Sequence, residues 1–299
     1  MSAPVAVFVY NRPIHTMKTI EALSRNIGAK DTEVFIFSDF AKNEAALDKV
    51  RAVREYINSE EVSTYFKSLN IIHAENNLGL ANSIINGVTD LINSYNRIIV
   101  LEDDLVTSTD FLSYMNEALN YYEENKKVWS ISGYTFKINY PSNYKSDIYL
   151  SYRGCSWGWA TWKNRWEEVD WQVSDYHTFK NDKKSRKEFN RGGRDLSFML
   201  DKQMEGKKDS WAIRWCYSQF KHDLLTVYPR ISRVRNIGLD GSGTHSKATS
   251  KYTVDLYDAP EKCRFEYPGL NEKIIRRFKN YYGSALLYFI IGIKKKIIK

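Results

Sequence analysis

The chain has 299 residues, a formal net charge of +8 and 43% hydrophobic residues, which is enough apolar sequence for a substantial core. Most of the charge lies at one end: residues 271–299 contain eight Lys or Arg and one Glu, so the first 270 residues are nearly neutral. A neutral body with a basic end argues against a nucleic-acid-binding protein.

The cysteines and the apolar runs indicate the compartment. Cys155, Cys216 and Cys263 are widely spaced and match neither a disulfide framework nor a CxxC metal site, so we expect free thiols in a reducing compartment. The N-terminal stretch MSAPVAVFVYNRP lacks the basic region of a signal peptide. The longest apolar run, residues 285–293, is about half of the roughly 20 residues that a membrane-spanning helix needs. We therefore expect a cytoplasmic chain.

The first hundred residues alternate between strand-like and helix-like segments. Each expected strand is a short apolar run that ends at polar residues, and each expected helix has apolar residues at helical spacing. This alternation predicts an α/β fold with a mostly parallel sheet and helices on both faces, which binds ligands at the carboxyl ends of its strands. The expected strands are 5–9, 34–37, 70–73 and 97–101, and the expected helices are 14–26, 44–58 and 80–94.

The second half is less regular. We expect a mobile loop at the polar and basic residues 180–194, and a strand followed by a glycine-rich loop within 228–246. Residues 153–171 contain five of the eight tryptophans; Trp162 and Trp166, four residues apart, are expected to face the core from a helix. No repeat or low-complexity linker interrupts the chain, which favours one compact domain. Further expected elements are a helix at 111–124, a strand at 128–132 and a helix at 211–222.

Polar residues follow the expected strands, above all Glu102, Asp103 and Asp104 after the apolar residues IIVL. Strand capping explains a single polar residue at such a position, but three adjacent carboxylates repel one another and suggest a bound cation. Mg²⁺ and Mn²⁺ take oxygen ligands, often one or two carboxylates with substrate phosphates and water. The pattern of an EF-hand calcium loop is missing. Neighbouring acids on one strand end rarely face each other across a bond, as a glycosidase requires.

Several stretches together resemble the GT-A glycosyltransferases, and more closely the N-acetylglucosaminyltransferase I-like branch and bacterial family 2-like sugar transferases. VLEDD after a buried strand looks like their DxD-type motif. The resemblance covers roughly residues 4–246 and does not extend beyond about residue 250. The stretches that carry it, in chain order, are VYNRP (9–13), FSD (37–39), VLEDDLVTSTDFLSYM (100–115), VWSISGY (128–134), SWGWATWKNRW (156–166) and DSWAIRW (209–215).

The resemblance implies a fold and an activity. The fold would be a Rossmann-like GT-A domain at residues 1–250, with a nucleotide-binding half at 1–110 and an acceptor and catalytic half at 111–250. The activity would be metal-dependent transfer of a hexosyl or N-acetylhexosaminyl group from a nucleoside-diphosphate sugar, a UDP-sugar being favoured. The acceptor would be a saccharide or a lipid-linked saccharide, and the transfer an inverting single displacement in bacterial polysaccharide or lipopolysaccharide assembly.

The resemblance also implies roles for individual residues. Asp104 would ligate Mn²⁺ or Mg²⁺, and His245 would be a further ligand of the metal or the diphosphate. Asp209 would be the catalytic base, although a helix N-cap is the alternative role for it. Trp157, Gly158 and Trp159 would face the acceptor sugar, with core packing as their alternative role. The residues implied in donor binding are Tyr10, Arg12, Asp39, Asn82, Glu102 and Asp103.

Residues 251–299 form an expected C-terminal extension whose last part, 273–299, interleaves basic, aromatic and aliphatic residues. An amphipathic basic helix of this kind can lie on an anionic membrane, here the cytoplasmic face of the inner membrane. A terminal helix packed on the domain is the alternative. Two rival functions also stay open: a non-catalytic carbohydrate-binding protein on the same scaffold, and a Mg²⁺-dependent nucleotidyltransferase.

Overall fold

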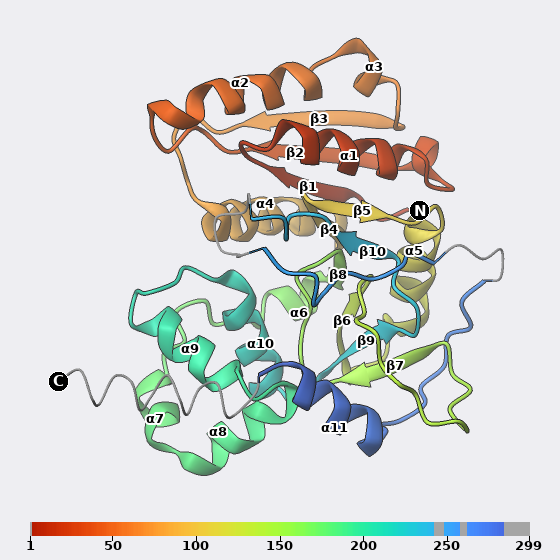
Figure 1. Cartoon of the computed structure of the whole chain (residues 1–299), viewed down its shortest axis with the longest axis vertical. Helices are drawn as coiled ribbons and strands as arrows, with labels where there is room; N and C mark the ends of the chain where they lie inside the picture. Colours follow the sequence, from red (N-terminus) through yellow and green to blue (C-terminus); the bar gives the residue numbers. More distant parts are fainter. Residues whose placement is uncertain (1, 242–247, 258–261, 284–299) are drawn as a thin grey trace.

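A computed structural model describes residues 2–241, 248–257 and 262–283 of the chain. Its centre is an eight-stranded sheet with the strand order β3-β2-β1-β4-β8-β6-β9-β7, and a two-stranded sheet pairs β10 with β5 (Figure 1). Helices lie on both faces of the large sheet. The predicted fold class, a mixed α/β fold built on a mostly parallel sheet with flanking helices, is confirmed.

The parallel part of the sheet contains β1 (Val5–Val9), β2 (Glu33–Ser38), β3 (Ser68–His73) and β4 (Arg97–Glu102). β1 lies between β2 and β4, with Val9 beside Ser38 and Phe8 beside Glu102. All four strands run in the same direction, so their carboxyl ends meet at one edge. The residues that follow these strands are thereby brought together.

Side chains alternate between the two faces of β1, as a fully buried strand requires. Val5 and Val7 pack in one core cluster with Ile20 of α1 (Pro13–Ser24) and Val53 of α2 (Glu44–Ile57). Ala6 and Phe8 pack in the other cluster, against α4 (Leu80–Tyr95). The helices that follow the first strands therefore cover opposite faces of the sheet.

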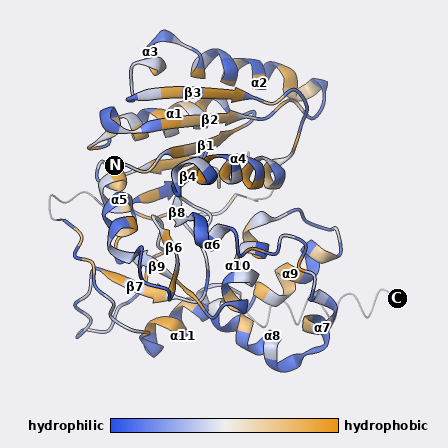
Figure 2. Ribbon diagram, turned by 180° about the vertical axis from the view of Figure 1, so that it is seen from behind, coloured by the Kyte–Doolittle hydropathy of each residue, from blue (hydrophilic) through white to orange (hydrophobic). Residues whose placement is uncertain are grey.

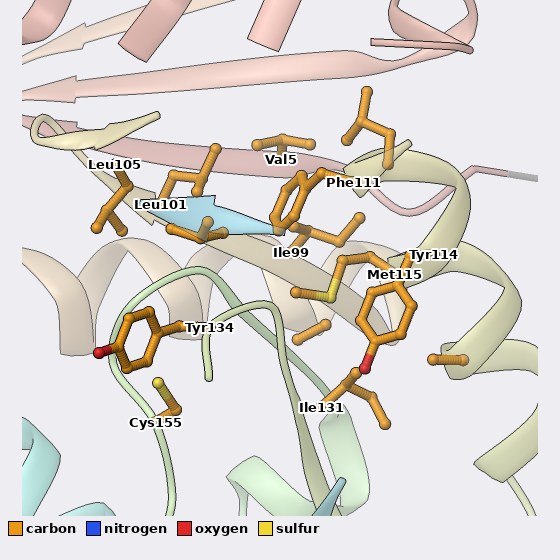
Figure 3. Packing of buried hydrophobic residues seen from close by; sticks show 14 of the residues in the cluster. Val5, Ile99, Leu101, Leu105, Phe111, Tyr114, Met115, Ile131, Tyr134 and Cys155 are labelled. Carbon is orange, nitrogen blue, oxygen red and sulfur yellow. The ribbon is translucent and has the colours of Figure 1, made fainter. Parts of the chain in front are cut away.

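The remaining strands continue the same sheet beyond β4. β8 (Trp159–Trp162) pairs antiparallel with β4, followed by β6 (Val128–Ser132), β9 (Leu225–Pro229) and β7 (Ile148–Ser151). α5 (Phe111–Tyr122) covers one face, where Phe111 and Met115 contribute to the cluster that includes Leu101 (Figure 3). The sheet thus joins the two expected halves of the domain without a break between them.

The short sheet fixes the region just after β4. β5 (Leu105–Thr107) pairs antiparallel with β10 (Val234–Asn236), with Leu105 beside Asn236. This pairing places the residues after β10 next to the residues that precede β5, although about 130 positions separate them in the chain. The sequence predicted a strand and a glycine-rich loop here, but not the strand with which they pair.

Two local predictions were wrong. Residues 180–194 are not a loop, because α8 (Lys183–Phe189) forms there: the Asp182 carboxylate accepts hydrogen bonds from two N–H groups of its first turn, and Phe189 is buried. Trp162 does not lie on a helix but ends β8, while Trp166 lies in α6 (Lys163–Trp166); both are buried, as expected. The other helices and 3-10 helices are η1 (Ala29–Asp31), α3 (Glu60–Ser63), α7 (Tyr176–Asn181), η2 (Asn190–Gly192), α9 (Leu196–Met204) and α10 (Trp211–Lys221).

The C-terminal helix α11 (Glu272–Tyr281) packs on the body of the domain. Phe278 is 1% exposed and contacts the rings of Phe136 and Tyr228, whereas Arg276 and Arg277 are exposed. The apolar and polar residues of α11 therefore divide between an inner and an outer face (Figure 2). Residues 272–281 therefore pack on the domain, and membrane association of the extension stays a prediction; residues 284–299 lie outside the described part of the chain. No helix within the described residues is long and apolar enough to cross a membrane.

Candidate functional site

The three carboxylates lie where the sequence placed them, at the carboxyl end of the buried strand β4. Glu102 is the last residue of the strand, and Asp103 and Asp104 form the turn that leads into β5. Both aspartates are buried, at 4% and 8% exposed. The Thr19 hydroxyl donates to the Asp103 carbonyl at 2.9 Å, and the Ile237 N–H donates to the Asp104 carbonyl at 2.8 Å. The turn is therefore fixed from two sides.

Arg12, the N-cap residue of α1 in the segment after β1, is the cation that faces these acids. Its Nη2 lies 2.9 Å from the Asp104 Oδ2 and also donates to the Asp103 Oδ1, while its Nε donates to the Asp103 Oδ2 at 3.3 Å. The guanidinium is thus bidentate to Asp103 and reaches Asp104 at the same time. The predicted donor-side residues Arg12 and Asp103 are brought together with the predicted metal ligand.

The electrostatics follow from this crowding. Burial raises the pKa of Glu102 well above its ordinary value, and the neighbouring charges of Asp104 and Asp103 raise it further. Burial also raises the pKa of Asp103, against the opposing effect of Arg12. Burial lowers the pKa of Arg12, but the two aspartates outweigh it, so the net shift is upward and the guanidinium stays charged.

One atom of the cluster fits a metal ion. The Oδ1 of Asp104 is buried and has no hydrogen-bond partner within the described part of the chain. A buried carboxylate oxygen without a partner is costly, and hard divalent cations bind such oxygens. Arg12 also brings only one positive charge to the two aspartates that it contacts. However, no group of three or more His, Cys, Asp or Glu among the described residues is arranged around a metal position. The other ligands would be phosphate oxygens and water.

The segment after β10 covers the acids. A Cβ at Gly238 would come within 2.6 Å of the Arg12 Nη1 and 2.8 Å of the Asp104 Cγ. The Gly238 N–H donates to the Asn236 side chain at 2.8 Å, and the His15 Nε2 lies 3.2 Å from the Asp240 carboxylate. Sequence reasoning missed this contact, since nothing local in the sequence links Gly238 to Asp104. His245, the predicted further ligand, lies outside the described residues.

Asp39 organises a turn at the same edge. Its two carboxylate oxygens accept from the N–H groups of Leu78 and Gly79, at 2.9 and 3.0 Å, and from the Asn77 side chain at 3.0 Å. These bonds hold residues 77–79 beside the end of β2. Asp39 thus shapes the loop in front of α4 as well as being a candidate donor contact.

Tyr10 and Asn82 flank this edge. The Tyr10 hydroxyl accepts from the Lys42 N–H at 3.0 Å. Asn82 is exposed in the first turn of α4 and donates to the Leu78 carbonyl at 3.0 Å. Both are therefore available at the surface near the strand ends, and their donor roles stay predictions.

Of the two tryptophans predicted to face the acceptor sugar, one lies near the surface and the other in the core. Trp157 is partly exposed and meets the rings of Tyr134 and Tyr252 edge to face. Trp159 is fully buried and packs on Trp211, at a ring-centroid distance of 5.1 Å. The sugar-facing role predicted for Trp159 is therefore wrong, because its position in β8 turns the indole into the core.

Gly158 lies between these two tryptophans, and its backbone conformation favours glycine over any other residue. Its φ of +63° lies in the left-handed region, and a Cβ would come within 2.7 Å of Val234. The same Cβ would also lie 3.4 Å from the side chain of Leu101, the residue before Glu102. Gly158 therefore allows the turn that carries Trp157 to approach the acidic strand end closely.

Asp209 lies just before α10 and is exposed, with its carboxylate 3.3 Å from the Arg214 Nη2. The N-cap of the helix is Ser210, whose hydroxyl accepts from the Ile213 N–H, so the capping role considered for Asp209 is filled by its neighbour. Trp211 packs on Trp159, which pairs with Val100 two residues before Glu102. The start of α10 is thereby tied to the carboxyl half of β4.

Comparison with known proteins gives little beyond this geometry. No family model and no curated protein matches the sequence. Among solved structures, S. aureus TarS is 15% identical with a TM-score of 0.32, covering 49% of this chain and 24% of its own. GalNAc-T7, solved with UDP, GalNAc and Mn²⁺, is 10% identical with a TM-score of 0.48, covering 79% of this chain and 44% of its own. This chain spans less than half of each of these proteins. At such values the likenesses carry no conclusion about its activity.

Proposed function

We propose that the chain is a metal-dependent glycosyltransferase that moves a sugar from a nucleoside-diphosphate sugar, with a UDP-sugar as the favoured donor. The observation that supports this most is the cluster of Arg12, Asp103 and Asp104 at the carboxyl edge of the parallel sheet, with the Asp104 Oδ1 left unpartnered. Ligands of open α/β sheets bind at this edge. A cluster of acids and one arginine suits a diphosphate carried by a divalent cation.

The donor would be activated by charge at its leaving group. Bound Mn²⁺ or Mg²⁺ would neutralise the diphosphate that leaves as the glycosidic bond breaks. Asp104 would hold that cation, and Arg12 would add a second positive charge on the phosphate side. Glu102 and Asp103 would accept hydrogen bonds from the ribose and the donor sugar. The burial of the acids keeps water away from these charges and strengthens their effect.

The acceptor side would depend on Asp209 and Trp157. Asp209 would take the proton of the acceptor hydroxyl as its oxygen attacks the anomeric carbon, which gives an inverting single displacement. Its exposed carboxylate is free of the helix cap, which Ser210 supplies. Trp157 is partly exposed, and a pyranose ring of the acceptor would stack on its indole.

We further propose a place for the enzyme in the cell. The resemblance noted above favours the N-acetylglucosaminyltransferase I-like and bacterial family 2-like enzymes, and hence transfer of a hexosyl or N-acetylhexosaminyl group in bacterial polysaccharide or lipopolysaccharide assembly. A lipid-linked acceptor fits a peripheral enzyme on the cytoplasmic face of the inner membrane. The exposed basic residues Lys273, Arg276 and Arg277 on α11 support an anionic surface as partner.

The central test is ligand-induced stabilisation. UDP-, GDP- and dTDP-sugars are added with Mn²⁺ or with EDTA, and the melting temperature is measured. A donor at about a hundred times its Kd should raise Tm by about 5 °C with Mn²⁺ and by much less with EDTA. Asp104→Asn should lose the Mn²⁺-dependent part, whereas Asp90→Asn, at an exposed position on α4, should keep it. No stabilisation by any donor would refute the proposal.

The two rival functions predict different results for the wild-type protein and the Asp104→Asn variant. A carbohydrate-binding protein would bind glycans equally well as the Asp104→Asn variant, and a nucleotidyltransferase would release pyrophosphate from a nucleoside triphosphate. The structure weakens the first rival, because Trp159, Trp162 and Trp166 are all buried and unable to stack on a sugar. Membrane binding is tested separately, by sedimentation with vesicles that contain anionic lipid: replacing Lys273, Arg276 and Arg277 with Gln should weaken it if the proposal holds.

A further inference from the structure

Arg12 has two roles that compete for its N–H groups. It is the only basic side chain within the described residues that forms an ion pair with Asp103 or Asp104. Its Nη2 reaches the Asp104 Oδ2 at 2.9 Å, so it neutralises the very carboxylate that would hold a metal. The proposed enzyme also needs Arg12 beside the diphosphate. The two aspartates engage Nε and Nη2, so that only the N–H groups of Nη1 are left for phosphate oxygens while Arg12 stays in this position.

The charges indicate how the conflict is resolved. Arg12 brings one positive charge to the two aspartates that it contacts, whereas a divalent cation brings two. Once a cation and a diphosphate are both present, Asp104 no longer needs Arg12, while the phosphates gain from it. The Arg12 side chain is 17% exposed, so it has a path toward a ligand at the edge of the sheet.

We infer that Arg12 is an exchangeable counterion: it pairs with Asp103 and Asp104 in the free protein, and moves toward the diphosphate when a divalent cation takes its place at Asp104. This inference rests on the proposed function. Its consequence is energetic coupling, because the cation and the nucleotide each displace Arg12 from the same contact. Each therefore strengthens the binding of the other, and the coupling is reciprocal.

The unpartnered Asp104 Oδ1 gives the exchange a starting point. Oδ2 faces Arg12, whereas Oδ1 is buried without a partner, so a cation can contact Oδ1 before Arg12 leaves Oδ2. Gly238 limits where the two side chains can move. It packs against both the Asp104 carboxylate and the Arg12 guanidinium and leaves no room between them and the backbone. The exchange is thus confined to a short movement of one side chain.

The test measures Mn²⁺ binding directly, by electron paramagnetic resonance of the free ion, without any turnover. Wild type and Arg12→Met are titrated with Mn²⁺ alone and with UDP, GDP or dTDP present. Arg12→Met should bind Mn²⁺ alone about tenfold more tightly than wild type, because nothing competes for Asp104. A nucleoside diphosphate should tighten Mn²⁺ binding in both proteins, since phosphate is itself a ligand, but by about tenfold less in the variant.

Arg235→Met is the matched control. Arg235 lies on β10 near the site, is exposed and has no ion pair within the described residues, so its loss removes one positive charge without freeing a carboxylate. It should bind Mn²⁺ like wild type. Arg12→Lys serves if Arg12→Met does not fold, because a point charge cannot engage both aspartates; its affinity for Mn²⁺ alone should also exceed that of wild type.

The outcomes separate the two proposals. Equal Mn²⁺ affinity of wild type and Arg12→Met, with equal enhancement by the nucleotide, would overturn the counterion exchange while leaving a metal-dependent transferase intact. Weaker Mn²⁺ binding by Arg12→Met would also overturn the exchange, because Arg12 would then be holding Asp104 in place for the metal. A wild type that binds no Mn²⁺ under either condition would overturn both.

Discussion

Gly238 lies directly against Asp104, although the two residues come from segments far apart in the chain. A Cβ at position 238 would approach the Asp104 Cγ to 2.8 Å and the Arg12 Nη1 to 2.6 Å, distances that side-chain carbons do not adopt. The strand pair β5 and β10 sets this approach, and the bond from the Ile237 N–H to the Asp104 carbonyl maintains it. The carboxylate can keep its place only while residue 238 lacks a side chain.

Gly238→Ala is therefore expected to disturb the acidic cluster. The added methyl would displace either the Asp104 carboxylate or the segment after β10, at a cost of about 1–3 kcal/mol in unfolding free energy. Mn²⁺-dependent stabilisation by the nucleotide should be lost as well. Gly206→Ala is the control: its φ of +68° makes it strained too, but nothing lies within 4 Å of the added carbon. It should lose stability and keep Mn²⁺ binding. Unchanged Mn²⁺ binding by Gly238→Ala would show that the segment is not part of the site.

Asp209 and Ser210 allow catalysis and capping to be tested separately. Asp209→Asn should leave unfolding by urea nearly unchanged, since the residue is exposed and is not the cap, but should abolish sugar transfer through a fall in kcat. Ser210→Ala should show the reverse, losing about 1 kcal/mol of stability with transfer retained. Transfer is followed by release of the nucleoside diphosphate from the donor identified in the thermal screen. If Asp209→Asn transfers sugar at the wild-type rate, another residue is the base.

The strand ends were predictable because they depend on local pattern and topology alone. Short apolar runs marked β1 and β4, and a parallel sheet brings their carboxyl ends together wherever the chain goes next. The sequence could therefore place Arg12 and the three acids at one edge. It could not show that Arg12 pairs with Asp103 and Asp104, because that contact depends on side-chain geometry across 91 positions.

The predictions for Trp159 and for residues 183–189 were wrong for two different reasons. Trp159 belongs to the core because β8 inserts beside β4, a pairing that no local pattern announces. The helix at 183–189, by contrast, carried a readable signal: Asp182 is a favourable N-cap, followed by residues of high helix propensity, but the polar composition suggested a loop. For these residues the N-cap and the helix propensities predict the structure better than the polar composition does.

α11 should contribute strongly to the stability of the domain. Phe278 is 1% exposed and contacts Phe136, Tyr149 and Tyr228, so Phe278→Ala should lower the unfolding free energy by about 3–5 kcal/mol. Arg277→Ala, its exposed neighbour, should change it by less than about 0.5 kcal/mol. Urea unfolding followed by tryptophan fluorescence measures both. A small effect of Phe278→Ala would mean that α11 does not dock in solution, and would favour the membrane-associating role for it.

The buried thiol of Cys216 should make stability depend on pH in the alkaline range. Burial raises its pKa to about 11 in the folded chain, against about 9 when unfolded. The unfolded state thus loses this proton first, so the stability contribution is complete below pH 9 and is lost as the pH rises from about 9 to about 11.

Cys216→Ala should remove that part of the pH dependence. The unfolding free energy of wild type should fall by about 1 kcal/mol more between pH 8 and pH 10 than that of the variant, as measured by urea titration at both pH values in a reducing buffer. The comparison uses the difference within each protein, so the methyl-sized cavity left by the substitution does not enter. Parallel pH profiles for the two proteins would show that Cys216 ionises as readily in the folded chain as in the unfolded one, which would require water to reach a thiol that is 4% exposed.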